Sequence, residues 1–342
     1  MIYRSKAPLR IGLAGGGTDV SPYSDQFGGA ILNATVSLFA YANIELMEEN
    51  KIIVEALDRK EQQQFEWSAE LPINGTLDLL KGVYNRIYKD YEFPKKGFRL
   101  STFVDAPAGS GLGTSSTLVV AIIGAFAEWL KLPLGDYDIA HYAYQIERND
   151  LKLTGGKQDQ YAAMFGGVNF MEFYEEDKVI VNPLRIKSEY LHELENNLVL
   201  YFTATSRESA SIIDEQVKNV NNKNEKSIEA MHQLKEQARM MKEALLKGKL
   251  NEFGEILDFG FQQKRRMANN ISNSRIEEIY EAAKKAGATG GKISGAGGGG
   301  FMIFYCPGNS HHAVVEQLKK FGGEVKNYTF TKYGLTTWCA SD

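Results

Sequence analysis

The sequence predicts a protein of the α+β class that is built as two domains. Its 342 residues are enough for two domains of ordinary size. In the first half, strand-like segments of alternating or β-branched residues are interspersed with segments of helical spacing. From about residue 208 the pattern changes to a series of long helical segments, followed by a few more strand-like ones. We therefore predict an N-terminal domain over residues 1–190 and a C-terminal domain over residues 191–342.

The strands of the first half are recognised by alternation, as in the segment 97–104, where Phe98, Leu100, Thr102 and Val104 share one side. On patterns of this kind, and on β-branched enrichment, we expect strands over 2–13, 40–47, 51–57, 97–104 and 168–173. Apolar residues spaced by three and four, or apolar runs that follow a good capping residue, predict helices over 77–88, 114–132, 136–149 and 159–165.

The second half is richer in helices. We predict long helices over 208–218, 226–247, 250–269 and 276–286, interrupted by a polar stretch after the first of them. Strands are expected over 198–203, 301–305 and 325–331, with a helix over 310–321 before the last strand.

Composition and charge argue against several functional classes. The formal net charge is −4 and no long run of Lys or Arg occurs, so we expect no nucleic-acid partner. The longest apolar segment, residues 118–130, contains Glu128 and is shorter than a membrane span, so we expect no membrane partner. The N-terminus lacks the apolar core of a signal peptide, and Cys306 and Cys339 have no metal-like spacing. These features predict a cytoplasmic protein with free thiols.

Glycine is the residue type whose distribution is most informative. The chain has 33 glycines, whereas average usage would give roughly 24. Fourteen of the 33 lie in three short clusters, at residues 12–17, 109–113 and 290–300. Because glycine is costly to order, such clusters indicate places where the backbone bends sharply or approaches a ligand closely.

The second cluster has the features of a phosphate-binding loop. It lies in Pro107-Ala-Gly-Ser-Gly-Leu-Gly-Thr-Ser-Ser116, directly before a predicted helix that is apolar on nearly every face. Close glycines allow several backbone N–H groups to face one anion, and the helix N-terminus adds further free donors. The pattern is neither a Walker A loop nor a dinucleotide fingerprint. A simple glycine turn before a capped helix remains open as the alternative.

The other two clusters are weaker signals when taken alone. The first follows Arg10 and ends at Thr18 and Asp19, which places a cation and a carboxylate at opposite ends of a strand and turn. The third contains Lys292 and Ser294 and has strand-like flanks on both sides, which argues against a flexible linker.

Together, the three clusters resemble motifs one, two and three of the GHMP kinases, which are named for galactokinase, homoserine kinase, mevalonate kinase and phosphomevalonate kinase. Their order and spacing match over essentially the whole chain. Within the family, the segments that begin at Ala14, Gly113 and Gly156 look most like D-glycero-D-manno-heptose 7-phosphate kinases. The resemblance implies ATP-dependent phosphorylation of this sugar phosphate at its anomeric oxygen, giving the 1,7-bisphosphate.

The resemblance also implies a fold. We expect the GHMP kinase fold, in which an N-terminal ATP-binding domain similar to domain 2 of ribosomal protein S5 precedes a ferredoxin-like C-terminal domain. ATP would lie between the two domains.

Roles for individual residues follow from the same resemblance. ATP would be bound by motif two, which comprises Gly109, Ser110, Gly111, Leu112, Gly113, Thr114, Ser115 and Ser116. Mg²⁺ would be held by Ser115 and Glu147, and Asp159 would be the catalytic aspartate, kept ionised by Arg10. The sugar would be bound by Thr18, Asp19, Gly295, Ala296, Gly297 and Gly298.

The sequence departs from the family pattern in two places. Ser116 stands where other members often have Ala. Gly15-Gly-Gly replaces the Gly-Glu-His of the galactokinases, which makes galactose a poor guess for the substrate.

A substrate that already has a phosphate needs a second anion site. The candidate cations are Arg148, Lys157, Arg207, Lys264, Arg265 and Arg266. The run from Lys264 to Arg266 is more simply interpreted as a solvated helix face, and the sequence does not decide among the others.

Three other functions share parts of the same motif pattern. A fucokinase-like sugar 1-kinase has similar motifs, and some relatives bind ATP and sugar only to signal. A third alternative is a relative that phosphorylates an acid and then expels its carboxylate. The presence of Arg10, Ser115, Glu147 and Asp159 disfavours a non-catalytic sensor, and the sugar-like Thr18-Asp19 pair disfavours the decarboxylase. The sequence does not decide the oligomeric state, for which a homodimer is one candidate.

Overall fold

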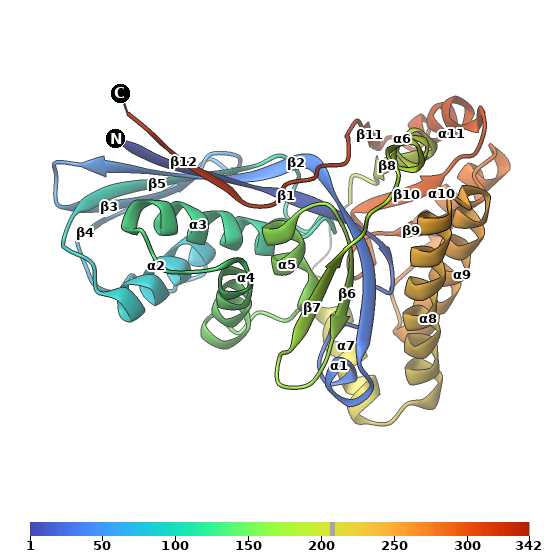
Figure 1. The fold of residues 1–342 in the computed structure, drawn as a ribbon, viewed down its shortest axis with the longest axis horizontal. Coiled ribbons are helices and arrows are strands. Elements are labelled where there is room, and N and C mark those ends of the chain that lie inside the picture. The colour runs from blue at the N-terminus through green and yellow to red at the C-terminus, as the bar shows by residue number, and fades with distance from the viewer. Residues whose placement is uncertain (206–208, 342) are drawn as a thin grey trace.

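Two long antiparallel strands form the centre of the computed structural model, which describes residues 1–205 and 209–341. Strand β1 (Ile2–Ala14) pairs along its whole length with β2 (Gly29–Met47), so that Ile2 faces Glu45 and Ala14 faces Leu32. Figure 1 shows β2 bending as it passes from one half of the molecule into the other. Because β1 and β2 run through both halves of the molecule, they bring residues of either half to the region where the halves meet.

The larger sheet has eight strands in the described residues. Its path is β12-β1-β2-β5-β3-β4, and β6 and β7 continue from the first part of β2. The pair β3 and β5 is parallel, with helix α2 between them in the chain, and the other pairs are antiparallel. The remaining strands are β3 (Lys51–Ala56), β4 (Glu61–Glu66), β5 (Gly97–Val104), β6 (Val168–Phe173), β7 (Val179–Pro183) and β12 (Thr336–Ala340).

Helices cover one face of this sheet (Figure 1). They are α2 (Asp78–Tyr91), α3 (Thr114–Leu130), α4 (Asp136–Gln145), a π-helical turn (Ile146–Asp150) and α5 (Gln158–Phe165). The side chains of α3 are apolar on nearly every face, and this helix is accordingly buried between the sheet and α2, α4 and α5. Its burial is the main packing force that fixes the α3 N-terminus in place.

The second half contains a four-stranded sheet in the order β11-β8-β10-β9. The strands are β8 (Leu198–Phe202), β9 (Gly290–Ile293), β10 (Phe301–Tyr305) and β11 (Glu324–Lys326). The helices of this half are α6 (Ser188–Asn197), α7 (Ser209–Asn221), α8 (Glu225–Lys247), a 3₁₀ turn (Leu250–Glu252), α9 (Phe253–Met267), α10 (Ser274–Lys285) and α11 (Ser310–Lys319). A short helix, α1 (Tyr23–Phe27), follows the first glycine cluster.

Most predicted elements are confirmed, and the strands predicted over 97–104, 168–173 and 301–305 have the observed bounds. The predicted last strand is wrong, because β11 ends at Lys326 and the chain forms β12 only at Thr336–Ala340. Strand β12 lies at the edge of the larger sheet, where half-exposed residues give no apolar pattern. It therefore joins the sheet of the first half, and the boundary near residue 190 stays a prediction.

Within the described ranges, no helix combines the length and the apolar character that crossing a bilayer requires.

Candidate active site

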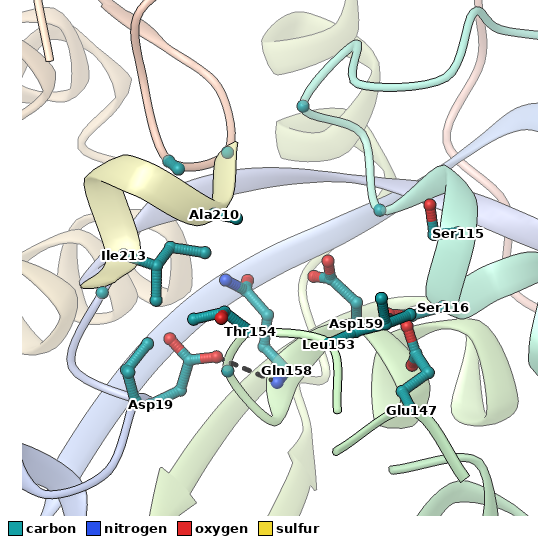
Figure 2. Close-up of a pocket in the computed structure, with 18 of the residues that line it drawn as sticks. Asp19, Ser115, Ser116, Glu147, Leu153, Thr154, Gln158, Asp159, Ala210 and Ile213 are labelled. Atoms are coloured by element: carbon teal, nitrogen blue, oxygen red, sulfur yellow. Dashed lines mark hydrogen bonds between the residues drawn. The ribbon is translucent and has the colours of Figure 1, made fainter. Parts of the chain in front are cut away.

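A cavity of about 290 Å³ lies where the three glycine clusters meet. Each cluster contributes to its wall, through Gly17, through Gly109, Gly111 and Gly113, and through Gly295. Figure 2 shows the polar side chains that point towards this space from α3, α5 and the first glycine cluster. The clusters are far apart in sequence but adjacent in space. The first follows β1 and the second precedes α3, and these two elements pack on each other. The third begins in β9, which packs on α9, and α9 in turn contacts β1.

The loop before α3 presents backbone donors to the cavity. Gly111 and Gly113 have φ of +84° and +77°, a region that residues with a Cβ rarely adopt. No acceptor within the described residues takes the N–H groups of Gly111, Leu112 or Gly113, or those of the first three residues of α3, whereas the Thr117 N–H donates to the Gly113 carbonyl at 2.9 Å. These free donors and the helix N-terminus together form an anion-binding surface.

The third cluster supports this loop through backbone contact. A Cβ on Gly111 would lie 2.8 Å from the Ser294 carbonyl oxygen, so only glycine allows the two loops to touch. The Phe301 N–H donates to the Ser110 carbonyl at 2.8 Å. Ser110 and Leu112 are fully buried, so their side chains anchor the loop and do not face the cavity.

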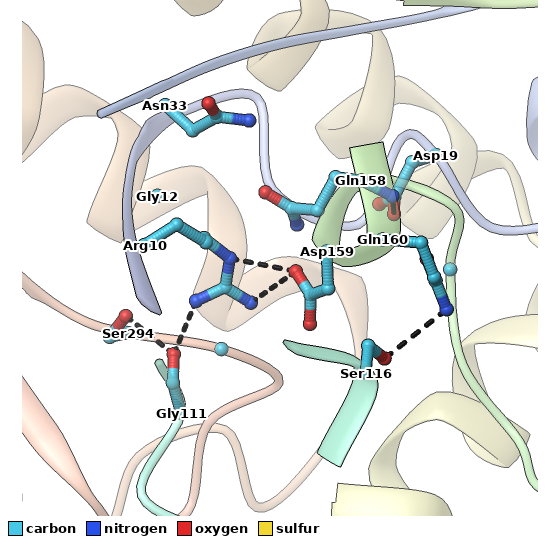
Figure 3. A network of polar contacts seen from close by, with 12 residues as sticks. Arg10, Gly12, Asp19, Asn33, Gly111, Ser116, Gln158, Asp159, Gln160 and Ser294 are labelled. Atoms are coloured by element: carbon cyan, nitrogen blue, oxygen red, sulfur yellow. Dashed lines mark hydrogen bonds and ion pairs between the residues drawn. The ribbon is translucent and has the colours of Figure 1, made fainter. Parts of the chain in front are cut away.

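Arg10 and Asp159 form an ion pair at the bottom of the cavity (Figure 3). Arg10 Nε and Nη2 lie 2.7 and 2.6 Å from Asp159 Oδ1, and Arg10 Nη1 donates to the Gly111 carbonyl at 2.6 Å. Strand β1 holds Arg10, which is buried, and the first turn of α5 holds Asp159, whose carboxyl is a quarter exposed. The arginine therefore links the glycine loop to a carboxylate that remains accessible.

Asp19 occupies the N-terminus of the same helix. Its Oδ2 accepts hydrogen bonds from the backbone N–H groups of Lys157 (2.9 Å) and Gln158 (3.1 Å). Burial raises the pKa of the Asp19 carboxyl above its usual value, although these hydrogen bonds oppose the shift. A Cβ on Gly156 would come within 1.9 Å of Asp19 Oδ2, so this glycine makes the close approach possible.

Glu147 lies on the π-helical turn, beside the start of α3. Its Oε1 accepts from Ser116 Oγ at 3.0 Å and its Oε2 accepts from Gln160 Nε2 at 2.5 Å. Burial raises the pKa of Glu147, while the nearby Arg148 acts in the opposite direction. In Figure 2, Ser116 lies between Glu147 and Ser115. Of the two serines, Ser115 is exposed and Ser116 is buried.

These oxygens fit a magnesium ion. Mg²⁺ is bound by one or two carboxylates and hydroxyls, with phosphates and waters completing its ligands. A buried carboxylate whose pKa is raised by desolvation, next to two hydroxyls and a phosphate-binding loop, is such a donor set. Within the described ranges no group of three or more His, Cys, Asp or Glu forms a metal site, so the phosphates would be needed.

The residues predicted to bind sugar are placed differently from one another. Asp19, Gly295 and Ala296 line the cavity. Thr18 is fully buried, and its hydroxyl proton lies between the carbonyl oxygens of Gly15 and Ala30, 2.8 and 3.0 Å from the hydroxyl oxygen, which shapes the turn. Gly297 and Gly298 lie behind the wall, where the Gly298 N–H donates to the carbonyl of Ile271, and their sugar contact stays a prediction.

One prediction about the candidate cations was wrong. Lys264 is not on a solvated helix face, because it is 3% exposed and lines the cavity. Leu257, Phe261, Lys264 and Met267 follow each other at helical spacing and form the buried stripe of α9. This stripe is visible in the sequence and could have revealed the position of the lysine.

The other candidate cations have different surroundings. Arg266 is exposed, and Arg265 pairs with Glu277 at 2.6 Å. Lys157 is buried between Asp25 and Asp177, at 3.3 and 2.9 Å, away from the cavity wall. Arg148 lines the cavity, and Arg207 lies outside the described residues.

Two residues near the site were not predicted as functional. Lys292 on β9 is buried, and its Nζ donates to the Gly12 carbonyl at 2.8 Å. Gln158 lines the cavity, and its Oε1 is buried without a hydrogen-bond partner among the described residues. A single lysine or glutamine in a sequence gives no signal of this kind, because only the fold brings it to the site.

A second cavity of about 300 Å³ adjoins the first across the start of α3. The two share Thr114, Ser115 and Leu153, and the second is lined mainly by apolar side chains such as Leu79 and Leu118. The pair of cavities provides an apolar compartment and a polar compartment on either side of one glycine loop.

Comparisons with known proteins agree with this geometry. The model of the GHMP kinases N terminal domain matches residues 78–167, and that of the GHMP kinases C terminal matches residues 241–324. The D-glycero-alpha-D-manno-heptose 7-phosphate kinase of Campylobacter jejuni subsp. jejuni serotype O:2 is 48% identical over 335 residues, 98% of each chain. This chain belongs to the GHMP kinases.

The predicted family and fold of this kinase are therefore confirmed. A crystal structure described as a D-glycero-D-manno-heptose 1-phosphate kinase from Bacteroides thetaiotaomicron superposes with a TM-score of 0.85 at 46% identity, covering 99% of this chain and 100% of that one. The L-fucokinase/L-fucose-1-P guanylyltransferase of Bacteroides fragilis is only 26% identical, over 87% of this chain and 34% of its own. As a GHMP kinase, the protein transfers a phosphate to an alcohol group of a small molecule.

Proposed function

We propose that this kinase transfers the γ-phosphate of ATP to the anomeric hydroxyl of D-glycero-D-manno-heptose 7-phosphate. The observation that supports this most is the 48% identity to a heptose 7-phosphate kinase over 98% of both chains. Identity falls to 26% for the fucokinase relative, which makes fucose the weaker candidate.

The two adjoining cavities suit ATP. The apolar compartment beside Leu79 and Leu118 would take the base, and the phosphates would lie against the free N–H groups of Gly111 and Gly113. Thr114, which borders both compartments, would then lie between the two ends of the nucleotide.

Asp159 is placed to act on the acceptor. Its Oδ1 is held by Arg10, and its other oxygen remains for the acceptor hydroxyl. The acceptor oxygen forms a bond to the γ-phosphorus, the bond from that phosphorus to the β,γ-bridging oxygen breaks, and ADP leaves with the electron pair. The hydroxyl proton passes to Asp159. Phosphoryl transfer depends mainly on positioning, so the orientation of the hydroxyl by Asp159 is a large part of this role.

Ser115 and Glu147 would hold Mg²⁺, as their oxygens suit that ion. When bound, the ion supplies charge neutralisation on the ATP phosphates. Ser116 and Gln160 hydrogen-bond to the Glu147 carboxylate and fix its orientation.

Asp19 is the proposed sugar ligand. Two backbone donors already hold one of its oxygens, which leaves the other free to accept a sugar hydroxyl. Thr18 supports it by fixing the turn, and Gly295 and Ala296 supply the opposite wall.

We further propose that the protein lies in the cytoplasm, which the free thiols of Cys306 and Cys339 support. We also propose a homodimer, which analytical ultracentrifugation would test.

ADP release is the experiment that tests the proposed function. Heptose 7-phosphate, fucose, galactose and mevalonate are compared as acceptors, and the new phosphate is located by phosphorus NMR. We expect turnover with heptose 7-phosphate and a new anomeric phosphate. Turnover with fucose alone would support the fucokinase alternative, and tight binding of ATP and sugar without any ADP release would support a sensor.

A further inference from the structure

We propose that Lys264 binds the phosphate group that the acceptor sugar already has, and that Lys292 strengthens this site from the layer behind it. The proposal rests on the proposed function, because it concerns the same cavity. Lys264 is thereby chosen among the candidate cations for the second anion, and the glycine at position 16 gains a role beside it.

Lys264 has hydrogen-bonding capacity that the described residues do not use. It lies on α9, is 3% exposed and lines the cavity. Its ammonium group has three donors, and the Gly295 carbonyl is the one acceptor that it contacts among the described residues. No carboxylate lies within ion-pair distance of it there, and Asp19 acts on its charge only from farther away. A buried cation of this kind is stable only when an anion or another acceptor completes its contacts.

Lys292 adds a second amine to the same region. It is 5% exposed, and its Nζ donates to the Gly12 carbonyl at 2.8 Å. Burial lowers the pKa of both lysines, to about 8 for Lys264, and each shift is increased by Arg10. Lys292 is not on the cavity wall, so we assign the direct contact to Lys264 and a supporting role to Lys292.

Gly16 lies beside both amines and places no side chain against them. A Cβ built on this residue would lie 3.8 Å from Lys264 Nζ and 3.9 Å from Lys292 Nζ, and no other atom would be closer. The backbone of Gly16 is outside the left-handed region, so its conformation does not require glycine. A methyl group at this position would therefore contact both amines and take the place of other contacts on that side.

The other cations have carboxylate partners or lie elsewhere. Arg148, which also lines the cavity, donates to the carbonyls of Leu153 and Gly156 and lies 3.7 Å from Glu147, although its Nε is buried without a hydrogen-bond partner among the described residues. Lys157 is paired with two carboxylates, and Arg265 is paired with one. Among these candidates, within the described residues, Lys264 thus combines access to the cavity with the lack of a carboxylate at ion-pair distance.

Kinetics with paired acceptors test the assignment. KM and kcat are measured at pH 7 with heptose 7-phosphate and with the same heptose lacking its phosphate. We expect Lys264→Met to raise KM for the phosphorylated sugar on the order of 30-fold, because a charge-assisted hydrogen bond is lost. The kcat, and the KM for the unphosphorylated sugar, should change less than about threefold.

Three further variants distinguish a specific contact from a general disturbance. Lys264→Arg keeps the charge and should recover most of the affinity. Gly16→Ala adds a methyl group without a clash and should raise KM for the phosphorylated sugar selectively, because the methyl group contacts both amines and covers part of their surface. Arg266→Met, an exposed cation on the same helix, is the matched control and should leave both constants unchanged.

The outcomes separate this proposal from the proposed function. An equal loss for both sugars, or no loss in Lys264→Met, overturns the anion site even if the enzyme is a heptose kinase. If the wild type releases no ADP with heptose 7-phosphate, the proposed function fails. The anion site at Lys264 is then tested by measuring the binding of inorganic phosphate calorimetrically, on enzyme saturated with a non-hydrolysable ATP analogue. Phosphate binding that disappears in Lys264→Met supports the site, whereas equal binding or none in the wild type overturns it.

Discussion

The two ends of the cavity differ in the kind of polar group that they present. At the end where we propose that the nucleotide binds, these groups are backbone N–H groups of the 109–113 loop and the first three residues of α3. At the end where we propose that the sugar binds, they are charged side chains from distant segments, with Asp19 and Lys264 on the wall and Lys292 behind it. The difference shows that a site made of backbone depends on one local conformation. A site made of side chains depends on the whole fold.

The carboxylate between the two ends should matter most. We expect Asp159→Asn to lower kcat on the order of 10³-fold, because the amide neither accepts the acceptor proton nor pairs with Arg10. ADP release gives kcat, and calorimetry should show that sugar and nucleotide still bind. Asp136→Asn, in the exposed first turn of α4, is the control. Full turnover in Asp159→Asn would remove this residue from the catalytic role.

The nucleotide end is tested by a change in the backbone conformation. Gly113→Ala puts a Cβ at a φ of +77° and within 3.1 Å of Asp159 Cγ, so both the loop and the Asp159 carboxylate must shift. We expect kcat/KM for ATP to fall on the order of 100-fold, while the affinity for sugar is largely kept. Gly308→Ala, at a φ of +60° with open space around it, controls for the cost of the backbone conformation itself. Equal effects in the two variants would contradict the proposed phosphate contact.

Two neighbouring serines allow a finer test of the same end. Ser115 is proposed to ligate Mg²⁺, whereas Ser116 hydrogen-bonds to Glu147. Ser115→Ala should raise the Mg²⁺ concentration needed for half-maximal activity on the order of tenfold. Ser116→Ala should change it less than about threefold, because Gln160 still holds the carboxylate. The reverse order of effects would move the metal contact to Ser116.

The sugar end should respond to pH in a way that the nucleotide end does not. The pKa of Lys264 is lowered to about 8 by burial and by Arg10, with Asp19 acting in the opposite direction, and Lys264 in turn lowers the pKa of the neighbouring Lys292. The ammonium form prevails below this pKa and is lost above it. From pH 7 to pH 8.5, KM for heptose 7-phosphate should therefore rise about fourfold, whereas KM for ATP should not follow this titration. Lys264→Arg should abolish the rise, and a rise that persists would assign the titration to another group.

The same contrast explains what the sequence could reveal. The 109–113 loop was predictable because a conformation with positive φ requires glycine, and because apolar residues mark α3 as a buried helix. Arg10, Glu147 and Asp159 give no such local signal, and their proposed roles came from the family resemblance. The structure adds that Arg10 links Asp159 directly to the Gly111 carbonyl.

The sugar end was harder to predict for physical reasons. Lys264 belongs to a run of three basic residues, a pattern that more often lies on a solvated helix face. Its burial depends on how α9 faces the cavity, and that in turn depends on packing against α8 and β9. Strand β12 was missed for a related reason, since a half-exposed edge strand needs no continuous apolar pattern.

Strand β12 has a consequence for how this protein is made. Ile2 pairs with Ala340, so β1 gains its outer neighbour only after the more than 300 residues between the two strands have been synthesised. During translation β1 has β2 on one side and an open edge on the other, which is a site where partly made chains can associate wrongly. A chain truncated before Thr336 keeps this defect, because it leaves the strand that holds Arg10 with an exposed edge.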